Sequence, residues 1–327
     1  MRASPWIAAA AALAAVLLIP PLISSGSDDD AGAQVRGLRI LVPNTPGGGY
    51  DITARQAAKA MEEADLTRNV EVFNLPGAGG TVGLGRLVNE AGNDKLVMSM
   101  GLGVVGSVHT NHSPSSLQDT TPIAKIIEEP DIVVVARDSP YRDVDQLIDA
   151  WKADPGAVPV GGGSSPGGPD HLASMLFAKA IGLAPKNVNY IPFDGGGELL
   201  SSVLGGKIAF GVSGVGEYRD QIESGDLRVL AVTSAEPLDG LDAPTLKESG
   251  VDVDFTNWRG IVAPPGISRN DTDRLVRLVT DLQDTPQWRE TLERNGWTPA
   301  FQPGEEFGEF LADESDRVAG VLAELGL

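Results

Sequence analysis

The stretch LRILVPNTPGGGYDITARQAAKAM, residues 38–61, contains a short apolar run, a loop of prolines and glycines, and an amphipathic segment. The apolar run at 38–42 has the composition of a β-strand. Ala54, Ala57, Ala58 and Met61 recur at the spacing of one helix face, which predicts a helix over 51–63. The glycines between the two elements therefore place bare backbone at the start of a helix.

Three other stretches repeat this order of strand, glycine turn and helix start: NLPGAGGTVG at 74–83, VGGGSSPGGPDHL at 160–172 and PFDGGGELL at 192–200. The first N–H groups of a helix have no partner within it, and the helix dipole adds partial positive charge there. Such turns bind anions without lysine or arginine, and basic residues are nearly absent from all four. A single turn of this kind would indicate only a tight connection. Four in one chain predict that at least one or two bind a ligand.

Strand-like and helix-like runs alternate along the chain, which is typical of a parallel-type sheet flanked by helices. We expect strands at 38–42, 70–73, 95–100, 131–136, 158–160, 189–192, 208–212 and 227–233, and a mostly helical tail over 270–322. These strands are too many for one sheet of average size, so the sequence predicts two α/β domains, each with its own sheet. The chain would leave the first domain near Arg137 and return to it near Thr233. Residues 34–137 and 233–327 would then form one domain, and 138–232 the other.

Composition excludes several classes of function. The 327-residue chain has a formal net charge of −20 and no cysteine. The negative charge argues against nucleic acid and anionic membrane surfaces as partners. Without cysteine, the chain can form no disulfide, thiolate metal site or cysteine nucleophile.

The first 33 residues are typical of an export signal. Arg2 precedes a 13-residue apolar run at 7–19, shorter than the roughly 20 residues that a membrane-spanning helix needs. Residues 31–33, Ala-Gly-Ala, fit a cleavage pattern, and 24–27 offers an alternative site. We expect 1–33 to be a signal peptide or leader of an exported, periplasmic or extracytoplasmic protein. An uncleaved segment that holds the protein at the membrane is the alternative.

Two motifs that are typical of enzymes occur in the chain, but the residues around each of them do not support the enzyme function. Residues 163–167, GSSPG, fit the G-x-S-x-G elbow of serine hydrolases with Ser165 as nucleophile, but the only later histidine is His171, at the start of the same helix. Residues 101–106, GLGVVG, fit a dinucleotide-binding pattern, but the polar stretch after them predicts no sustained helix. A serine hydrolase and a dinucleotide-dependent enzyme stay as alternatives.

The remaining histidines do not predict a metal site. His109 and His112 have a spacing that can bind metal, but we expect their segment to be an exposed loop, and no carboxylate pattern completes a site. The sequence therefore predicts no metal and no cofactor.

Several stretches together match one protein family. VPNTPGGGYDITAR fits a Pro-x-x-Pro-Gly-Gly-x-x-Asp-x-x-Ala-Arg pattern, NLPGAGGTVG contains a Pro-Gly-Ala-Gly-Gly turn, and YIPFDGGGELLSSVLGGK is similar to a Tyr-x-Pro-Tyr-x-Gly block. By these motifs the mature chain resembles the solute receptors of tripartite tricarboxylate transporters, the Bug-type periplasmic binding proteins. The resemblance implies a two-lobed Venus-flytrap fold, type II among periplasmic binding proteins. Each lobe would be a mostly parallel sheet flanked by helices, with the ligand in the interlobe cleft.

The resemblance also implies a function without catalysis. The protein would bind a small organic carboxylate, mainly by backbone amides, and deliver it to the membrane subunits of the transporter. We expect a monomer. A receptor that serves a sensor instead of a transporter is an alternative, and the identity of the carboxylate stays open.

The same resemblance implies a ligand site on the four turns. Its residues are Gly48, Gly49, Tyr50 and Asp51 in the first turn, Ala78, Gly79 and Gly80 in the second, Ser164, Ser165, Gly167 and Asp170 in the third, and Asp194 and Gly195 in the fourth. Asp51 would either cap its own helix or contact the ligand. This chain departs from the family pattern at Leu75, where arginine is common, and at Phe193, where tyrosine is usual. Such departures concern the ligand more than the family.

Overall fold

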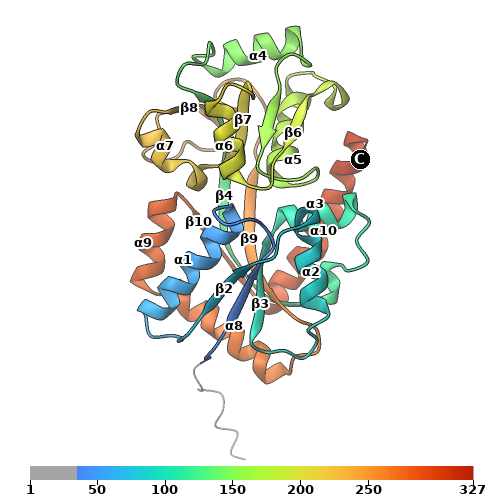
Figure 1. Ribbon diagram of the computed structural model, residues 1–327, viewed down its shortest axis with the longest axis vertical. Helices are drawn as coiled ribbons and strands as arrows, with labels where there is room; N and C mark the ends of the chain where they lie inside the picture. The colour runs from blue at the N-terminus through green and yellow to red at the C-terminus, as the bar shows by residue number, and fades with distance from the viewer. Residues whose placement is uncertain (1–34, 327) are drawn as a thin grey trace, which may run out of the picture. The chain divides into compact units, whose positions relative to one another are not determined.

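The computed structural model describes residues 35–326, so the expected leader over 1–33 lies outside the described residues. Strands and helices alternate along the described chain (Figure 1). The strands are β1 (Arg39–Val42), β2 (Glu71–Asn74), β3 (Leu96–Gly101), β4 (Thr121–Ala136), β5 (Val160–Gly162), β6 (Tyr190–Pro192), β7 (Phe210–Gly214), β8 (Leu227–Val232), β9 (Thr256–Ala263) and β10 (Thr298–Pro303).

The helices flank these strands. They are α1 (Gly49–Glu63), α2 (Thr81–Val88), α3 (Leu102–Thr110), α4 (Val144–Ala153), α5 (Pro169–Ala180), α6 (Gly196–Leu204), α7 (Arg219–Glu223), α8 (Arg269–Gln283), α9 (Pro286–Asn295) and α10 (Gly304–Leu325). Short 3-10 turns include η2 (Ala78–Gly80) and η5 (Val215–Glu217). Figure 1 shows α1 and α2 beside β1–β3, and α5 and α6 beside β5–β7.

Strand β4 pairs with two groups of strands. Up to Pro130 it pairs with β9 and β10, and β9 leads through β3 and β1 to β2. From Asp131 onward it pairs with β7 and β8, and β7 leads through β5 to β6. Pairing is parallel within β2-β1-β3 and within β6-β5-β7, whereas β4 is antiparallel to every strand it pairs with. The expected α/β fold is confirmed, and the shared strand β4 joins all ten strands into one continuous sheet.

Apolar packing holds α1 and α6 against the strands. The predicted face of α1, Ala54, Ala57, Ala58 and Met61, is buried and packs in one core cluster with residues of β1. In the other group of strands, residues of β4 pack against α6 in a separate cluster of their own. Burial of this kind, rather than helix propensity, supplies most of a helix's stability in a folded protein.

Most expected elements match the observed ones. Every expected strand corresponds to an observed strand, although β4 begins at Thr121, before the expected 131. Asp143 caps α4, accepting a hydrogen bond from the Gln146 N–H at 2.8 Å. Gly296 ends α9 in the left-handed conformation, and Pro303 is the N-cap of α10.

The sequence pattern misses β9, β10 and α3. The first half of β9 contains Thr256, Asn257 and Arg259, and β10 contains two prolines, so neither shows the apolar pattern of a strand. α3 corrects the expectation that no sustained helix follows residues 101–106. Its buried residues from Leu102 to Ser107 pack well enough to offset two glycines.

The expected histidine loop is also wrong in part. His109 lies in α3 and its Nε2 is 3.1 Å from Ser315 Oγ, whereas His112 lies in the turn that follows. Within residues 35–326, no group of histidine and acidic side chains is arranged to hold a metal ion. In the same range, the helices are all too short or too polar to cross a bilayer.

Candidate functional site: a pocket where the four glycine turns meet

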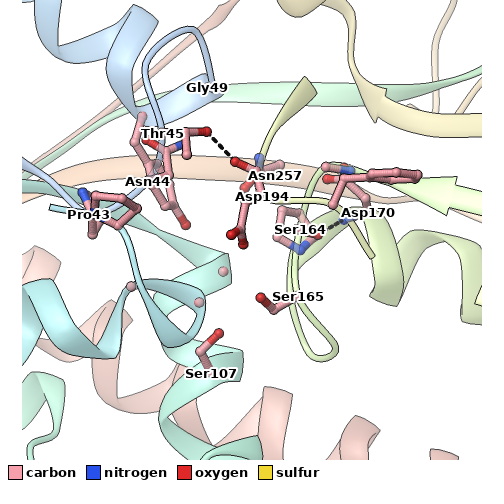
Figure 2. A pocket seen from close by; sticks show the side chains of 18 of the residues that line it. Pro43, Asn44, Thr45, Gly49, Ser107, Ser164, Ser165, Asp170, Asp194 and Asn257 are labelled. Atoms are coloured by element: carbon pink, nitrogen blue, oxygen red, sulfur yellow. Dashed lines mark hydrogen bonds between the residues drawn. The ribbon is translucent and has the colours of Figure 1, made fainter. Parts of the chain in front are cut away.

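One pocket collects residues from all four glycine turns (Figure 2). Its cavity volume is about 70 Å³, and the pocket is partly open to solvent. Its lining consists of Pro43, Asn44, Thr45, Gly49, Tyr50, Pro76, Gly77, Gly79, Gly80, Gly103, Ser107, Gly163, Ser164, Ser165, Pro169, Asp170, Phe193, Asp194, Glu217, Asn257 and Arg259. Turns that are far apart in the sequence thus share one crevice at the carboxyl ends of the parallel strands, where ligands of α/β folds bind.

The structure brings together most of the predicted site residues. Those that line the pocket are Gly49, Tyr50, Gly79, Gly80, Ser164, Ser165, Asp170 and Asp194. The other predicted residues lie in the same turns but do not line the pocket: Gly48, Asp51, Ala78, Gly167 and Gly195. The first-turn amides of α1, which begins at Gly49, have no acceptor within the helix and lie at the pocket wall.

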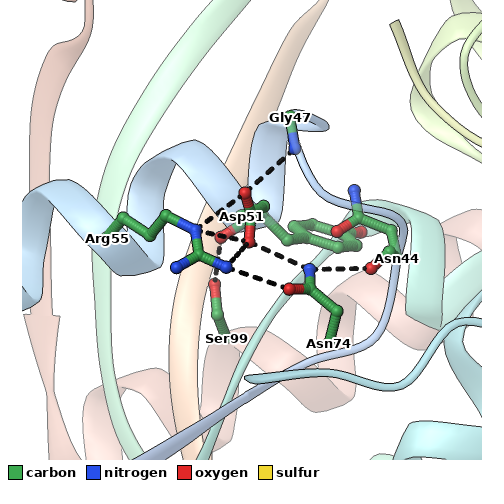
Figure 3. Close-up of polar contacts among 7 residues, drawn as sticks. Asn44, Gly47, Asp51, Arg55, Asn74 and Ser99 are labelled. Carbon is green, nitrogen blue, oxygen red and sulfur yellow. Dashed lines mark hydrogen bonds and ion pairs between the residues drawn. The ribbon is translucent and has the colours of Figure 1, made fainter. Parts of the chain in front are cut away.

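Asp51 organises the first turn from behind the pocket (Figure 3). Its buried carboxylate accepts hydrogen bonds from the Gly47 N–H at 2.9 Å, from Asn74 Nδ2 at 2.9 Å and from Arg55 Nε at 2.9 Å. Burial raises the pKa of Asp51, but the bonds from Arg55, Gly47 and Asn74 outweigh it and bring the pKa below its usual value. Asp51 therefore holds the loop and the helix start together as an ionised, paired acid.

The second turn fits its place only because it is built of glycine. Gly77, Gly79 and Gly80 all have positive φ angles, which glycine adopts without strain. A Cβ added at Gly79 would overlap the hydroxyl of Ser107 on α3. The hydroxyl oxygen of Ser107 is buried, lines the pocket and has no hydrogen-bond partner within residues 35–326.

The third turn uses several of its own groups internally. The Asp170 carboxylate accepts from the Gly163 N–H at 2.5 Å, and Ser164 Oγ accepts from the Asp170 N–H at 3.1 Å. Tyr190 donates its hydroxyl to the Ser164 carbonyl at 2.8 Å. Burial raises the pKa of Asp170 to about 6, although the Gly163 N–H opposes the shift. The side chain of Ser165 stays at the pocket surface (Figure 2).

His171 makes no hydrogen bond to Ser165 in the described part of the chain. Its Nδ1 accepts a hydrogen bond from the Gly167 N–H at 3.2 Å, and its ring packs edge-on against Tyr190. Burial lowers the pKa of His171 to about 4, so the ring stays neutral near pH 7. In a serine hydrolase, the histidine lies within hydrogen-bond distance of the nucleophilic serine. Here His171 Nδ1 instead bonds the backbone of its own turn.

The sequence analysis misses an arginine and an asparagine of β9 at the pocket. Arg259 of β9 is 2% exposed and pairs with Glu129 of β4 at 2.5 Å, while its Nη1 donates to Thr53 Oγ1 at 3.1 Å. Asn257, also on β9, is buried and its side-chain oxygen has no partner in the described chain. A motif search passes over these residues because β9 itself is not recognisable as a strand.

Glu217 of η5 is another pocket residue outside the four turns. A Cβ at Gly196 would overlap its Oε2, and a Cβ at Gly49 would lie 3.0 Å from its Oε1, so the carboxyl group lies between α6 and α1. Burial raises the pKa of Glu217 to about 8, and the neighbouring Asp170 adds to the shift. The start of α6 is therefore occupied by an acid from the protein itself.

Two hydrogen bonds tie the sides of the pocket together. Thr45 in the first turn donates its hydroxyl to the carbonyl of Asp194 in the fourth (Figure 2). Thr110 at the end of α3 donates to the Pro166 carbonyl at 3.1 Å. Both bonds join a segment next to the β1–β3 strands with a segment next to the β5–β7 strands.

Comparisons with known proteins agree with this architecture. A family model described as the tripartite tricarboxylate transporter family receptor matches residues 53–327. Protein BugT of Bordetella pertussis is 29% identical over 297 residues, which cover 89% of this chain and 90% of BugT.

Solved structures show the same fold. The periplasmic binding protein BugD aligns with a TM-score of 0.81 at 23% identity, covering 89% of this chain and 98% of BugD. MatC from Rhodopseudomonas palustris with bound malate aligns at 0.78 and 20% identity, covering 89% and 100%. An R. palustris protein with adipate aligns at 0.80 and 23% identity, covering 89% and 98%. Both the fold and the family motifs therefore place this chain in the tripartite tricarboxylate transporter receptor family of periplasmic solute-binding proteins.

Proposed function

We propose that the protein captures a small organic carboxylate in the pocket and delivers it to the membrane subunits of a tripartite tricarboxylate transporter. The observation that carries the proposal is the convergence of four glycine turns on one pocket. The helix-start amides at Gly49 and Tyr50, and the hydroxyls of Ser164 and Ser165, would bind the carboxylate oxygens. Malate and adipate, found in two proteins of the same fold, fit the class of ligand that such a site accepts.

The pocket supports binding rather than catalysis. In the serine motif, His171 Nδ1 accepts the Gly167 N–H, and no hydrogen bond joins His171 to Ser165 within residues 35–326. An esterase assay of the wild type and of a Ser165→Ala variant tests this directly. Serine-dependent turnover would establish the hydrolase alternative in place of transport.

The division into two lobes is part of the proposal. We place residues 34–137 and 233–327 in one lobe and 138–232 in the other, with the cleft between them. The change of partners along β4 between Pro130 and Asp131 supports a hinge there. Closure about such a hinge is the usual response of periplasmic receptors to their ligands. Export through the leader over 1–33 and action as a monomer complete the proposal.

Isothermal titration with a panel of mono-, di- and tricarboxylates tests the function. At least one carboxylate should bind saturably to the wild-type protein. Gly79→Ala should reduce its affinity at least tenfold, because the methyl group overlaps Ser107 and the φ of 61° disfavours alanine.

Gly85→Ala is the matched control for that variant. Gly85 lies in α2, and a Cβ there would meet nothing within 4 Å. Affinity of this control should equal that of the wild type. Absence of saturable binding across the panel would contradict the proposed function.

A further inference from the structure

A second pocket lies apart from the four glycine turns. Its cavity volume is about 560 Å³, within the range of roughly 300–1,000 Å³ that small-molecule sites span. Its lining shares no residue with that of the first pocket. Helices α7 and α9 lie along the same edge of the molecule, and both supply residues to this pocket (Figure 1). The cavity is therefore a separate space and no extension of the first pocket.

Arg219 lines this second pocket without a partner. It begins α7, and its Nε is buried but has no acceptor among the described residues. Its guanidinium forms no ion pair within residues 35–326. A Cβ added at Gly296 would lie 2.9 Å from its Nη2, so the side chain lies against the turn that follows α9. Native structures rarely keep a buried donor unsatisfied without a functional reason, which points to an acceptor from outside the chain.

The other charged side chains of the second pocket do not satisfy Arg219. Glu223, Asp239 and Glu293 line it, but all three are exposed, and none forms an ion pair with the arginine in the described chain. Arg289 is exposed as well and donates to a backbone carbonyl at 3.1 Å. Water and salt screen charges at such positions, whereas they screen a buried group much less. An anion in this pocket would therefore be attracted most strongly by Arg219.

Much of the remaining wall is apolar. The side chains that form it are Val215, Ile222, Leu238, Leu241, Leu292 and Trp297. They come from η5 and α7, from the loop after β8, and from α9 and the residue before β10. Such a wall favours a ligand that removes apolar surface from water. An open cation beside an apolar wall fits a molecule with an acidic head and a hydrocarbon body.

A thin layer of protein separates the two pockets. In η5, Val215 lines the second pocket and Glu217 lines the first. Trp297 lines the second pocket, and its ring centre is 5.7 Å from the guanidinium carbon of Arg259, which lines the first. A molecule in the second pocket would thus contact this layer without entering the first pocket.

We propose that the second pocket is a further ligand site, for a carboxylate with an aliphatic body, whose head is bound by the guanidinium of Arg219 and whose chain lies along the apolar wall. Arginine and a carboxylate form parallel charge-assisted hydrogen bonds, which would satisfy the buried Nε. A ligand without an acidic head would leave that donor unsatisfied. The site is distinct from the carboxylate pocket of the proposed function and does not depend on it.

Three ligands that share one chain and differ in the head group test the class of ligand. Octanoate, octanol and octylamine are titrated into the wild-type protein by calorimetry. Octanoate should bind saturably and at least tenfold more tightly than each of the other two. Equal affinity for octanoate and octanol would contradict the role of the arginine, and tighter binding of octylamine would contradict an acidic ligand. Absence of saturable octanoate binding would overturn the proposal as a whole.

Two variants locate the site. Arg219→Gln should reduce the affinity for octanoate at least tenfold, because the carboxylate loses its cation. Leu238→Trp should reduce it as well, because the larger side chain fills space along the apolar wall. Arg142→Gln removes the same charge from an exposed position outside both pockets and should leave the affinity unchanged. Octanoate binding that survives both pocket variants would overturn the assignment.

Gly79→Ala separates the second pocket from the first. It alters only the lining of the first pocket, so octanoate should bind this variant as it binds the wild type. If Gly79→Ala abolishes octanoate binding and Arg219→Gln does not, octanoate occupies the first pocket, and the inference fails while the proposed function holds. If octanoate binds as proposed but no carboxylate of the panel occupies the first pocket, the proposed function fails and the inference holds.

Thermal unfolding distinguishes a ligand site from a structural role of the arginine. The guanidinium has no partner in the described chain, so Arg219→Gln should unfold at the same temperature as the wild type when no ligand is present. Octanoate should raise the melting temperature of the wild type and not that of the variant. A ligand-free variant that unfolds at a lower temperature would show that Arg219 serves the fold, and the proposal would be wrong.

Discussion

The first and fourth glycine turns have the same backbone plan and opposite electrostatics. In the first, Asp51 is buried among Arg55, Asn74 and the Gly47 N–H, and its pKa lies below the usual value. In the fourth, Asp194 is exposed and its carboxylate has no partner among the described residues, while burial, with a contribution from Asp170, raises the pKa of Glu217, whose carboxyl group lies at Gly196, to about 8. An acid that is paired within its own loop supports structure, whereas an acid left open at a pocket is available to a ligand.

The largest effect should come from the buried arginine. Replacing Arg259 by alanine leaves Glu129 buried without its partner, which should cost about 3–5 kcal/mol of unfolding free energy. Arg55→Ala, at an arginine whose side chain is 49% exposed, should cost much less. Urea denaturation of the two variants measures the difference. Equal losses would show that burial does not separate the two pairs.

Asp51→Asn should destabilise the protein by about 2 kcal/mol at pH 7, because the buried carboxylate accepts charge-assisted hydrogen bonds from several donors. The folded-state pKa of Asp51 is lowered, so its contribution is present above the unfolded pKa and is lost as the pH falls below it. Asp194→Asn is the comparison, and thermal unfolding of the free protein should show no change for it. A destabilised Asp194→Asn variant would mean that this acid is structural after all.

Glu217 should contribute to stability with a pH dependence opposite to that of Asp51, and the Glu217→Gln variant removes this contribution. The folded-state pKa of Glu217, about 8, is raised above its ordinary value of 4.5. Its contribution to stability is therefore fully present below about 4.5 and is lost as the pH rises through about 8, with a slope of at most about 1.4 kcal/mol per pH unit. Comparing wild-type and variant denaturation across this range isolates Glu217 from His171, which titrates in both. Parallel curves for the two proteins would contradict the shift.

Thr45→Val should have the smallest effect. It removes the hydroxyl that holds the Asp194 carbonyl and keeps the side-chain shape, so the expected loss of stability is about 0.5–1 kcal/mol. The affinity for the ligand should fall as well, because the Asp194 carboxylate loses its fixed orientation. Calorimetry on the same variant checks this, and Thr81→Val, at an exposed hydroxyl bonded within its own turn, serves as the control.

Local pattern predicts the elements whose signal lies within a few residues. The face of α1 and the four glycine turns are of this kind, and the structure contains each of them. Family resemblance adds the grouping of the turns into one site, which periodicity alone does not imply.

The pocket residues that the sequence does not reveal depend on distant partners. Arg259 can be buried because it forms an ion pair with Glu129 on the neighbouring strand, diagonally across from it, and nothing near Arg259 in the sequence signals that pairing. Glu217 follows a short strand in a segment without any motif, and its character comes from α1 and α6 packing around it. The orientation of Asp51 likewise depends on Asn74, which arrives from β2.

The shared strand β4 couples the unfolding of the two groups of strands that pair with it. Because Thr121–Pro130 and Asp131–Ala136 are consecutive parts of one strand, neither group can dissolve without exposing unsatisfied backbone on the other. Denaturation should consequently occur as one cooperative event. A fragment of residues 138–232 alone would lack its central strand and should aggregate through the open edges of β7 and β8.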